Sequence, residues 1–351
     1  MRYPFLLYGS YGYTGALIVE AAVQRGLRPL LAGRDAARLQ EQATRLGLEH
    51  RAFSLDDTAA LDSALAESGL VLHCAGPFQH TSRPMVEACL RTQRHYLDIT
   101  GEISVYESLA ALDTQAQLAG VMLLPGVGFD VVPSDCLALH LKQRLPQATH
   151  LTVAIHSLGG GMSRGTALTG LEGLAMGALE RIDGKLVRVP YAARSRVIDF
   201  GHGPVTVVQA QWGDLSTAYY STGIPNIQSY LYFSPSVRRW MRLGRYFIGL
   251  AGSRPVNTLL KRMILSGPPG PSEETRRTGR SLLWAEVVDE KGRRLAARLE
   301  TPEGYHLTSL TALRAVEKVL NGEAHPGFQT PARCFGADFV LEFDGVSRQD
   351  L

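Results

Sequence analysis

The chain has 351 residues, of which 45% are hydrophobic and 20% charged, and its formal net charge is +3. This length favours two domains over one core, and the composition is ordinary for a globular protein. The small net charge argues against the basic stripe that nucleic-acid binding needs, so no nucleic-acid partner is expected.

The cysteines are widely spread and form no CxxC pair. They are Cys74, Cys89, Cys136 and Cys334. The sequence therefore predicts neither a metal site nor a disulfide framework and favours the reducing cytoplasm. The apolar run after Met1 is needed as a strand and is too short for a signal peptide. No transmembrane segment is expected, because glycine, proline or charge interrupts every apolar stretch.

Short β-rich runs alternate with longer helical patterns along the first part of the chain, as in a parallel sheet with crossover helices. Strands are expected at 5–8, 28–32, 51–55, 70–75, 96–99 and 121–124. Helices are expected at 14–25, 36–46, 58–67, 83–91 and 105–119. The fold class is therefore α/β, with a Rossmann dinucleotide-binding domain over residues 1–127.

The pattern changes after Pro125. Further strands are expected at 151–156, 186–189, 196–200 and 206–211, and a hairpin at 282–288 and 294–299. They predict a mostly antiparallel sheet in an α+β domain over residues 128–307, which binds substrate or dimerises. We expect a mobile loop at 266–281 and a helix at 309–320. The C-terminal helices, about 308–351, are expected to pack back on the Rossmann domain.

A GxxGxxG loop stands directly after the first strand and before the first helix. Its residues are Gly9, Ser10, Tyr11, Gly12, Tyr13, Thr14 and Gly15. The first glycine makes the tight turn, the second admits the pyrophosphate and the third allows close helix packing. The helix N-terminus adds donors for the phosphates, so the loop predicts dinucleotide binding.

The end of the second strand indicates which dinucleotide is bound. An NAD-preferring site places an acid there, whereas this chain has Arg34, which suits the 2′-phosphate of NADP(H). The alternative is a solvated Arg34 paired with Asp35. Asp56 either touches the adenine side or is an exposed loop acid.

A small, rigid turn follows the fourth strand, where the chain is expected to pass the nicotinamide-side ribose. Its residues are Ala75, Gly76 and Pro77. They are further candidates for cofactor binding, and the alternative is an ordinary loop between a strand and a helix.

A series of motifs runs in one order along nearly the whole chain. They are Gly9–Gly15, Ala32–Arg34, Cys74–Phe78, Tyr96–Glu102, Pro125–Asp130, Val132–Asp135, Gly165–Thr166, Trp212–Asp214 and Gly327–Ala332. In this order they resemble the saccharopine dehydrogenase-like oxidoreductases, in particular the branch that includes the trans-acting enoyl reductases.

The resemblance implies an NADP-binding Rossmann domain joined to an α/β domain that closes over the cofactor. It also implies oxidoreductase chemistry on a substrate that is undefined for most members. The saccharopine-forming enzymes carry a GxGxxG loop, whereas this chain has GxxGxxG, so the family name is not taken as an activity.

The protein has to orient the cofactor and supply a proton donor, because hydride transfer belongs to the cofactor. The Tyr-x-x-x-Lys pair of short-chain dehydrogenases is absent. Polar Asp98, Thr100 and Glu102 end the fifth strand, and Asp130 follows a glycine turn. Asp130 is the candidate catalytic residue; alternatively it braces the domain junction or caps the next helix.

A glycine-rich loop at 159–166 opens a later helix. Arg164 and Thr166 are therefore candidates for binding a carboxylate or phosphate of the substrate. The alternative is a flexible connection in which Ser163 or Thr166 caps the helix.

Three further residues are interpreted as structural. Cys136 is read as a packing residue on a helix at 135–144 that Ser134 caps. His73 and His95 are read as core or surface histidines.

Residues 237–251 predict a basic amphipathic helix. Its apolar positions are Val237, Trp240, Met241, Phe247, Ile248 and Ala251, and its basic positions are Arg238, Arg239, Arg242 and Arg245. The apolar face either packs on the second domain or on a partner subunit of a homodimer, or it serves as a lid or a peripheral membrane contact.

The leading hypothesis is an NADP(H)-dependent oxidoreductase acting on a small-molecule or acyl substrate, with enoyl reduction as the favoured reaction. The alternative is a nucleotide-binding scaffold or lipid-surface protein with little catalytic turnover.

Overall fold

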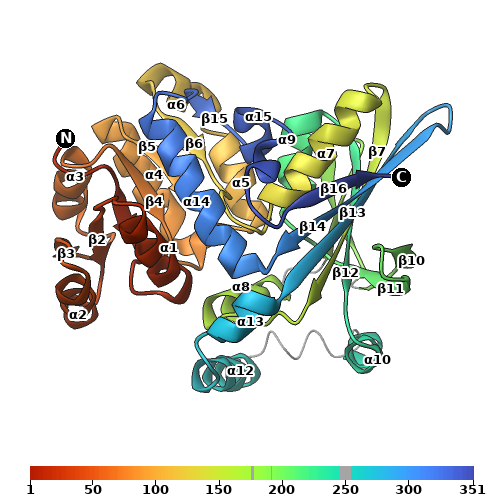
Figure 1. Ribbon diagram of the computed structural model, residues 1–351, viewed down its shortest axis with the longest axis horizontal. Coiled ribbons are helices and arrows are strands. Elements are labelled where there is room, and N and C mark those ends of the chain that lie inside the picture. The colour runs from red at the N-terminus through yellow and green to blue at the C-terminus, as the bar shows by residue number, and fades with distance from the viewer. Residues whose placement is uncertain (175–177, 191, 245–253) are drawn as a thin grey trace. The chain divides into compact units, whose positions relative to one another are not determined.

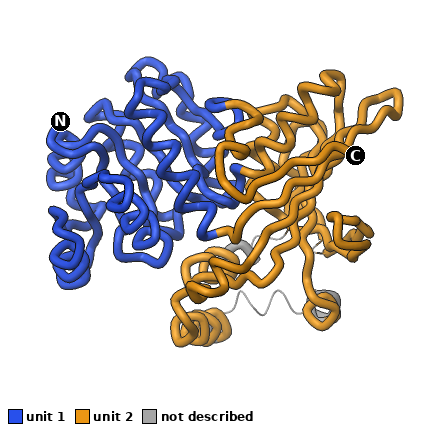
Figure 2. The backbone as a smooth tube through the Cα atoms, viewed as in Figure 1, with its two compact units in different colours: residues 1–132, 305–335 blue, residues 133–304, 336–351 orange. Residues whose placement is uncertain are grey.

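The computed structural model describes residues 1–174, 178–190, 192–244 and 254–351. They form two compact units, shown in Figure 2. Unit 1 comprises residues 1–132 and 305–335, and unit 2 comprises residues 133–304 and 336–351. The expected division lay at residues 127 and 307, with everything after 308 on the first domain. The structure differs in its last residues, 336–351, because they end in a strand of the second unit's sheet.

Unit 1 is built on a seven-stranded parallel sheet. Its strands are β1 (Leu6–Tyr8), β2 (Leu30–Gly33), β3 (His50–Ala52), β4 (Leu70–His73), β5 (His95–Asp98), β6 (Met122–Leu124) and β15 (Gly327–Phe328). Their order is β15-β6-β5-β4-β1-β2-β3 and every pairing is parallel. This is the Rossmann order, extended by one strand, so the predicted fold class is confirmed. Inner-strand leucines such as Leu6, Leu31 and Leu72 have no exposed surface, as expected for a sheet covered on both faces.

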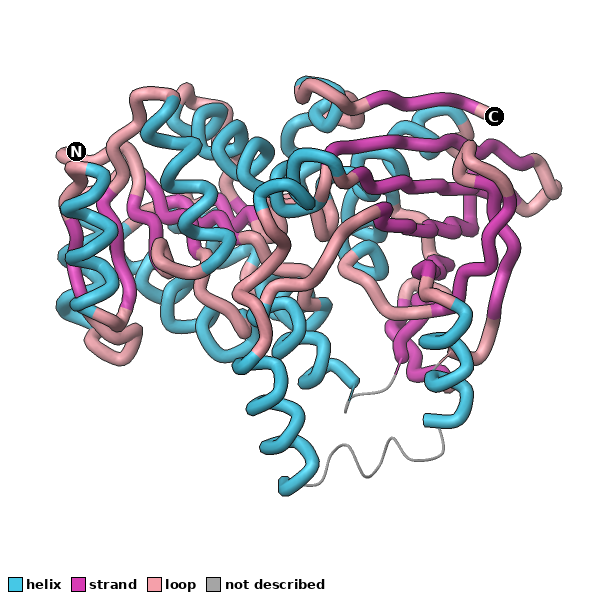
Figure 3. Tube along the Cα trace, turned by 60° about the horizontal axis from the view of Figure 1, so that its bottom comes forward, coloured by secondary structure: helices cyan, strands magenta, loops and turns pink. Residues whose placement is uncertain are grey.

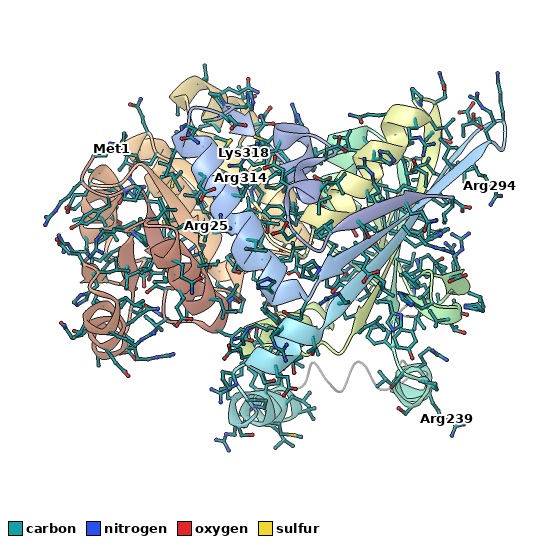
Figure 4. All side chains as sticks on the ribbon, viewed as in Figure 1. Met1, Arg25, Arg239, Arg294, Arg314 and Lys318 are labelled. Carbon is teal, nitrogen blue, oxygen red and sulfur yellow. The ribbon has the colours of Figure 1, made fainter. Side chains whose placement is uncertain are left out.

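The helices of unit 1 follow the strands in alternation. They are α1 (Tyr13–Gln24), α2 (Ala36–Leu46), α3 (Thr58–Ala66), α4 (Phe78–Thr92), α5 (Ile103–Ala110), α6 (Asp113–Ala119), α14 (Gly304–Leu320) and α15 (Pro331–Phe335). The left-handed Gly47 ends α2, at φ +63°. Helix α14 runs beside α1, joined to it by the Arg25–Glu317 ion pair at 3.2 Å (Figures 1 and 4).

Three helix predictions in unit 1 need correction. Helix α14 begins at Gly304 rather than at residue 309. Helix α4 begins at Phe78 rather than at Arg83. The single helix expected over 105–119 is two helices, because the chain restarts at Asp113. The Asp113 carboxylate accepts the N–H of Phe328 at 2.7 Å. The break between α5 and α6 therefore places a hydrogen-bond acceptor beside β15.

Unit 2 is built on a nine-stranded mixed sheet, visible in Figure 3. Its strands are β7 (Ala148–Leu158), β8 (Ala178–Ile182), β9 (Lys185–Val189), β10 (Ser195–Asp199), β11 (Pro204–Gln209), β12 (Asn226–Tyr232), β13 (Arg280–Asp289), β14 (Arg294–Pro302) and β16 (Ser347–Asp350). The main order is β10-β11-β12-β7-β13-β14-β16, with β8 on β12 and β9 on β8. Among the described strands of this second sheet, only β7 and β12 pair in parallel, which confirms the mostly antiparallel sheet.

The described helices of unit 2 are α7 (Val132–Arg144), α8 (Arg164–Leu174), α9 (Asp214–Thr222), α10 (Pro235–Gly244), α12 (Arg254–Ser266) and α13 (Glu273–Thr278). The loop expected at 266–281 contains a short helix, because Ser272 accepts the N–H of Thr275 and caps α13. The cap expected at Ser134 is also wrong. Helix α7 begins before it, and the Ser134 hydroxyl bonds the carboxylate of Asp214 instead.

The predicted basic helix over 237–251 lies only partly within the described residues. Helix α10 covers its first part, and residues 245–251 lie outside them. Val237 is 43% exposed, and Arg238 donates to the carbonyls of Thr206 and Phe233. Arg239 points away from α10 in Figure 4. No described helix is long and apolar enough to cross a membrane. A lid or membrane contact stays a prediction.

Candidate functional site

The strand order reverses between β1 and β4, so a ligand is expected at the carboxyl ends of these two strands. Gly9 follows β1 at φ +85°. A Cβ on it would lie 2.8 Å from the Ala75 nitrogen and 2.9 Å from the Ala75 Cβ, beyond β4. Only glycine fits this close approach, which brings the phosphate loop beside the 75–77 turn.

The phosphate loop presents polar groups to an anion. Helix α1 begins after Gly12, and no side chain of the described residues caps it by a hydrogen bond. Its first turn holds no acid, so the dipole of this end favours negative charge. The Ser10 hydroxyl is fully buried and has no hydrogen-bond partner within the described ranges. An orphaned donor beside an uncapped helix end fits a pyrophosphate.

The third glycine holds α1 close to the loop. A Cβ on Gly15 would lie 2.3 Å from the Gly9 carbonyl oxygen, so no larger residue fits without moving the backbone. Helix α2 also holds the loop through two hydrogen bonds. Arg38 Nη2 donates to the Tyr11 carbonyl at 2.9 Å, and Gln42 Nε2 donates to the Ser10 carbonyl at 2.9 Å.

Arg34 stands exposed at the end of β2, as the sequence predicts. Its guanidinium makes no ion pair or hydrogen bond with the part of the chain that the structure describes. The alternative pairing with Asp35 is not formed, since the Asp35 carboxylate accepts the N–H of Arg38 and caps α2. Burial raises the pKa of the nearby Tyr8 phenol to about 12, and the positive charge of Arg34 opposes that rise. An unengaged guanidinium at this strand end suits a phosphate monoester.

The start of α4 is already occupied by a carboxylate. Glu102 accepts the N–H of Phe78 at 2.7 Å and of Gln79 at 2.8 Å. These are the donors that an anion would otherwise find beyond the 75–77 turn. Glu102 therefore holds the turn in place.

Asp98 joins the ends of β5 and β6. Its carboxylate accepts the N–H groups of Thr100 at 2.9 Å and Gly126 at 2.8 Å, and the hydroxyl of Tyr96 at 2.6 Å. Burial raises the pKa of Asp98 to about 7, although these hydrogen bonds oppose the rise. Asp98 is fully buried, so its role here is to fix the strand ends.

Asp130 is the half-buried carboxyl at the same edge of the sheet. It lies against Gly101, where a Cβ would come within 2.7 Å of its Oδ2. Burial raises its pKa to about 6, and the negative charge of Glu102 adds to the rise. Its carboxylate has no hydrogen-bond partner within residues that the structure describes. A desolvated carboxyl titrating near neutrality can exist as the proton-donating form.

Helix α14 connects the phosphate loop with the turn that carries Asp130. Tyr305 packs edge-on against Tyr13, with ring centroids 5.1 Å apart. One turn later, Thr308 Oγ1 accepts the N–H of Phe129 at 2.9 Å. These two side chains stand three residues apart on one helix face, so the loop and the turn share one support.

The two candidate substrate residues lie in unit 2 and already have internal partners. Arg164 donates through Nε and Nη2 to the carbonyl of Gly267, at 2.9 and 2.6 Å, directly after α12. Thr166 donates its N–H to the Ser163 hydroxyl, which caps α8. This geometry is that of the alternative in which the loop only opens a helix. A substrate role for either residue stays a prediction.

The residues interpreted as structural are buried or partly so. Cys136 has no exposed surface and burial raises the pKa of its thiol, which confirms it as a packing residue. Burial lowers the pKa of His73 to about 3, and its Nε2 lies 2.9 Å from Thr81 Oγ1. His95 accepts the N–H of Met122, and burial lowers its pKa too.

The sequence did not indicate the contacts that support this site. Arg38 and Gln42 stand four residues apart on a predicted helix, which is the spacing of one helix face. Tyr305 and Thr308 offered no such signal, because they lie far along the chain from the loop. In the described residues no group of three or more His, Cys, Asp or Glu side chains is arranged to hold a metal ion.

Comparison with known proteins finds similarity over part of the chain. Residues 5–124 match the family model of the saccharopine dehydrogenase NADP binding domain. A trans-acting enoyl reductase of Mycobacterium leprae is 31% identical over 152 residues, which cover 41% of this chain and 36% of that protein. A saccharopine dehydrogenase-like oxidoreductase of Mus musculus is 28% identical over 164 residues, covering 40% and 38%. The match thus spans little more than a third of these curated relatives.

The fold of the whole chain is also known. Apo saccharopine dehydrogenase (L-Glu forming) from Saccharomyces cerevisiae superimposes with a TM-score of 0.69 at 13% sequence identity. The alignment covers 99% of this chain and 100% of that one. At this identity the match establishes the shared fold alone.

Proposed function

We propose that this chain, whose residues 5–124 belong to the saccharopine dehydrogenase NADP-binding domain family, is an NADP(H)-dependent oxidoreductase. Its substrate in this proposal is an enoyl, acyl or other small carbonyl-conjugated compound. The observation that carries the proposal is the phosphate loop at the switch point, with the unengaged Arg34 guanidinium at the end of β2. An NAD-preferring site has an acid at that position.

The residues around the loop have distinct parts in holding the dinucleotide. The start of α1 and the Ser10 hydroxyl bind the pyrophosphate, while Gly12 leaves room for it. Arg34 binds the 2′-phosphate. The 75–77 turn, held by Glu102, lines the nicotinamide side.

The reduction needs one hydride and one proton. NADP(H), when bound, supplies the hydride. Asp130 holds the proton, because burial and the Glu102 charge keep part of its carboxyl protonated near neutral pH. For a conjugated double bond the hydride adds to one carbon and the proton from Asp130 Oδ to the other, which leaves the carboxylate to be reprotonated from water.

The names of the curated relatives support enoyl reduction as the specific reaction. The relative from Mycobacterium leprae is called a trans-acting enoyl reductase. The match covers only 36% of that relative, so the substrate is carried over as a proposal only. In the alternative, a nucleotide-binding scaffold, the same loop would bind NADP(H) without turnover.

Titration with both nucleotides tests the cofactor assignment. Arg34→Ala should weaken NADPH binding by roughly 1.5–3 kcal/mol, the scale of a charged hydrogen bond, and leave NADH binding nearly unchanged. Equal losses for the two nucleotides would mean that Arg34 has a structural role and that the preference lies elsewhere.

Turnover with a panel of enoyl thioesters and conjugated ketones tests the chemistry. Asp130→Asn removes the proton and should lower kcat by about 100-fold or more with little change in KM. The wild-type kcat should fall as pH rises through about 6, because the acid form donates. Glu102→Gln removes a charge that raises this pKa and should move the fall to lower pH. Tight NADPH binding without turnover of any substrate would favour the scaffold.

A further inference from the structure

The side chain of Tyr11 lies across the end of β2. A Cβ on Gly33 would come within 2.5 Å of Tyr11 Cε1, so the phenol ring needs a glycine beneath it. The phenol oxygen accepts the backbone N–H groups of Arg34 and Asp35, each at 3.1 Å. The hydroxyl of a loop residue thus lies on the strand end where the adenosine ribose of a dinucleotide is expected.

With these two hydrogen bonds accepted, the Tyr11 hydroxyl still has its own proton to donate. A phenol oxygen has two acceptor positions and one proton, and both acceptor positions are in use. No acceptor for that proton is found in the part of the chain that the structure describes. Two N–H donors on the oxygen polarise the remaining O–H, so Tyr11 offers a strong neutral donor. Tyr11 is partly exposed, and the exposed Arg34 follows Gly33 directly.

Arg38 packs against the ring of Tyr11. Its guanidinium carbon lies 4.6 Å from the ring centroid, and its Nη2 donates to the Tyr11 carbonyl at 2.9 Å. The side chain and the backbone of Tyr11 are therefore held by one residue of α2. The hydroxyl is in place before any ligand binds, which lowers the entropic cost of using it.

We propose that Tyr11 is a specificity-determining residue that donates its hydroxyl proton to the 2′-phosphate of NADP(H), with Arg38 as its positioning residue. This inference rests on the proposed function and adds to the part of Arg34. A phosphate oxygen is a far stronger acceptor for a phenol than the 2′-hydroxyl of NAD(H), because the bond is charge-assisted. The phenol hydroxyl therefore discriminates between the two nucleotides without a charge of its own.

The test compares Tyr11→Phe with the wild-type full chain. Four probes are titrated: NADPH, NADH, adenosine 2′,5′-bisphosphate and 5′-AMP. The variant should bind NADPH and the bisphosphate about tenfold to a hundredfold more weakly, and NADH and 5′-AMP within about twofold of wild type. Tyr3→Phe is the matched control. The Tyr3 hydroxyl bonds Glu49 before β1 begins, so its loss should leave all four affinities unchanged.

A double-mutant cycle tests the positioning role of Arg38. Arg38→Ala should weaken NADPH binding clearly more in the wild type than in the Tyr11→Phe background, where only its bond to the Tyr11 carbonyl is left to lose. Arg38→Lys keeps the charge but loses the planar contact with the ring, so it should behave as Arg38→Ala. If Tyr11→Phe does not fold, comparing Arg38→Ala with Arg38→Lys on NADPH and NADH still tests the inference.

Four outcomes would contradict the inference or the proposed function on which it rests. Equal losses of NADPH and NADH in Tyr11→Phe would make Tyr11 a structural residue. Unchanged NADPH binding in that variant, with a selective loss in Arg34→Ala, would leave the proposed function standing and remove Tyr11 from it. Additive losses from Arg38→Ala and Tyr11→Phe would give Arg38 a contact of its own. A wild type that binds NADPH no better than NADH would contradict the NADP preference itself.

Discussion

Two carboxyl groups of unit 1, those of Asp98 and Asp130, have different roles although burial raises the pKa of both. Asp98 accepts three hydrogen bonds and is fully buried, whereas Asp130 is half-buried without a partner within the described residues. Burial raises the pKa of both, to about 7 and about 6. The two residues therefore differ in hydrogen bonding and in solvent exposure rather than in pKa alone. These differences distinguish the structural Asp98 from the candidate proton donor Asp130.

Asp98 makes the stability of the protein depend on pH. Its pKa is about 7 in the folded chain against an ordinary 3.8, so the folded state takes up a proton that the unfolded state has lost. The stabilisation is fully present below about pH 4 and is lost as pH rises through about 7. Relative to Asp98→Asn, the wild type should lose unfolding free energy over this range, by at most about 1.4 kcal/mol per pH unit.

Urea unfolding of both chains at several pH values measures this difference. The Asp98→Asn side chain keeps an oxygen for the N–H groups of Thr100 and Gly126, so the comparison isolates the titration. A difference in unfolding free energy that stays constant from pH 4 to pH 8 would show that Asp98 is ionised throughout.

At the scale of elements, helix ends account for several polar residues that look like ligand-binding groups. Glu102 occupies the start of α4, Ser163 caps α8, and Arg164 bonds the carbonyl that follows α12. Each fills a backbone position that a helix leaves unsatisfied. The start of α1, by contrast, has neither a capping side chain in the described chain nor an acid in its first turn.

Arg164→Ala tests whether that residue serves the helix or a substrate. Loss of the two hydrogen bonds to Gly267 should speed amide exchange over 256–266 and lower the melting temperature, at a cost of roughly 1.5–3 kcal/mol. Nucleotide affinity should not change. Arg164→Lys keeps the charge but loses the two-pronged guanidinium contact. Its amide exchange rate and melting temperature should lie between those of the wild type and Arg164→Ala. Unaltered exchange in α12 together with a higher KM would instead support the substrate role.

The sequence predicted well where one element carries its own signal. The six strands of the first sheet and the phosphate loop follow from runs of buried residues and from glycine spacing. Strand β15 did not follow, because two residues, Gly327 and Phe328, show no periodicity. Helix α13 stood in a stretch rich in proline and glycine, where Ser272 and the acids Glu273 and Glu274 were the signals for its start.

The candidate site was predictable only in part for a similar reason. Arg34 could be found because it ends a strand next to a glycine-rich loop. The contacts of Tyr11 with the 33–35 segment depend on how β1 and β2 bring two loops together, and a spacing rule does not contain that information. Tyr305 reaches Tyr13 from almost three hundred residues away in the sequence.

On the scale of the whole molecule, the chain passes between its two units three times, after residues 132, 304 and 335. Each unit is therefore assembled from two separate segments. The last segment carries β16, which pairs with β14, and Asp350, which forms ion pairs with His140 and Arg144 at 2.8 and 2.6 Å.

Truncation should separate the stabilities of the two units. Deleting 336–351 removes β16 and should lower the unfolding temperature of unit 2 while NADPH binding persists. NADPH at about 100 times its Kd should stabilise unit 1 by about 2.7 kcal/mol in the full and the shortened chain. Deleting 323–351 also removes β15 and α15 from unit 1. This longer deletion is the control, because it shortens both units and not unit 2 alone. Calorimetry reads both transitions, and loss of NADPH binding in the shorter deletion would contradict this division.

The late arrival of β15 has a consequence for biosynthesis. Strand β6 is translated early, but its outer neighbour is Gly327–Phe328, so all of segment 133–304 is made in between. During that interval the nascent sheet presents β6 as an open edge, which is a template for mispairing. Helix α14, with the Tyr305 and Thr308 contacts, is missing for the same interval. The dinucleotide can therefore bind the complete unit only after translation has passed Phe335.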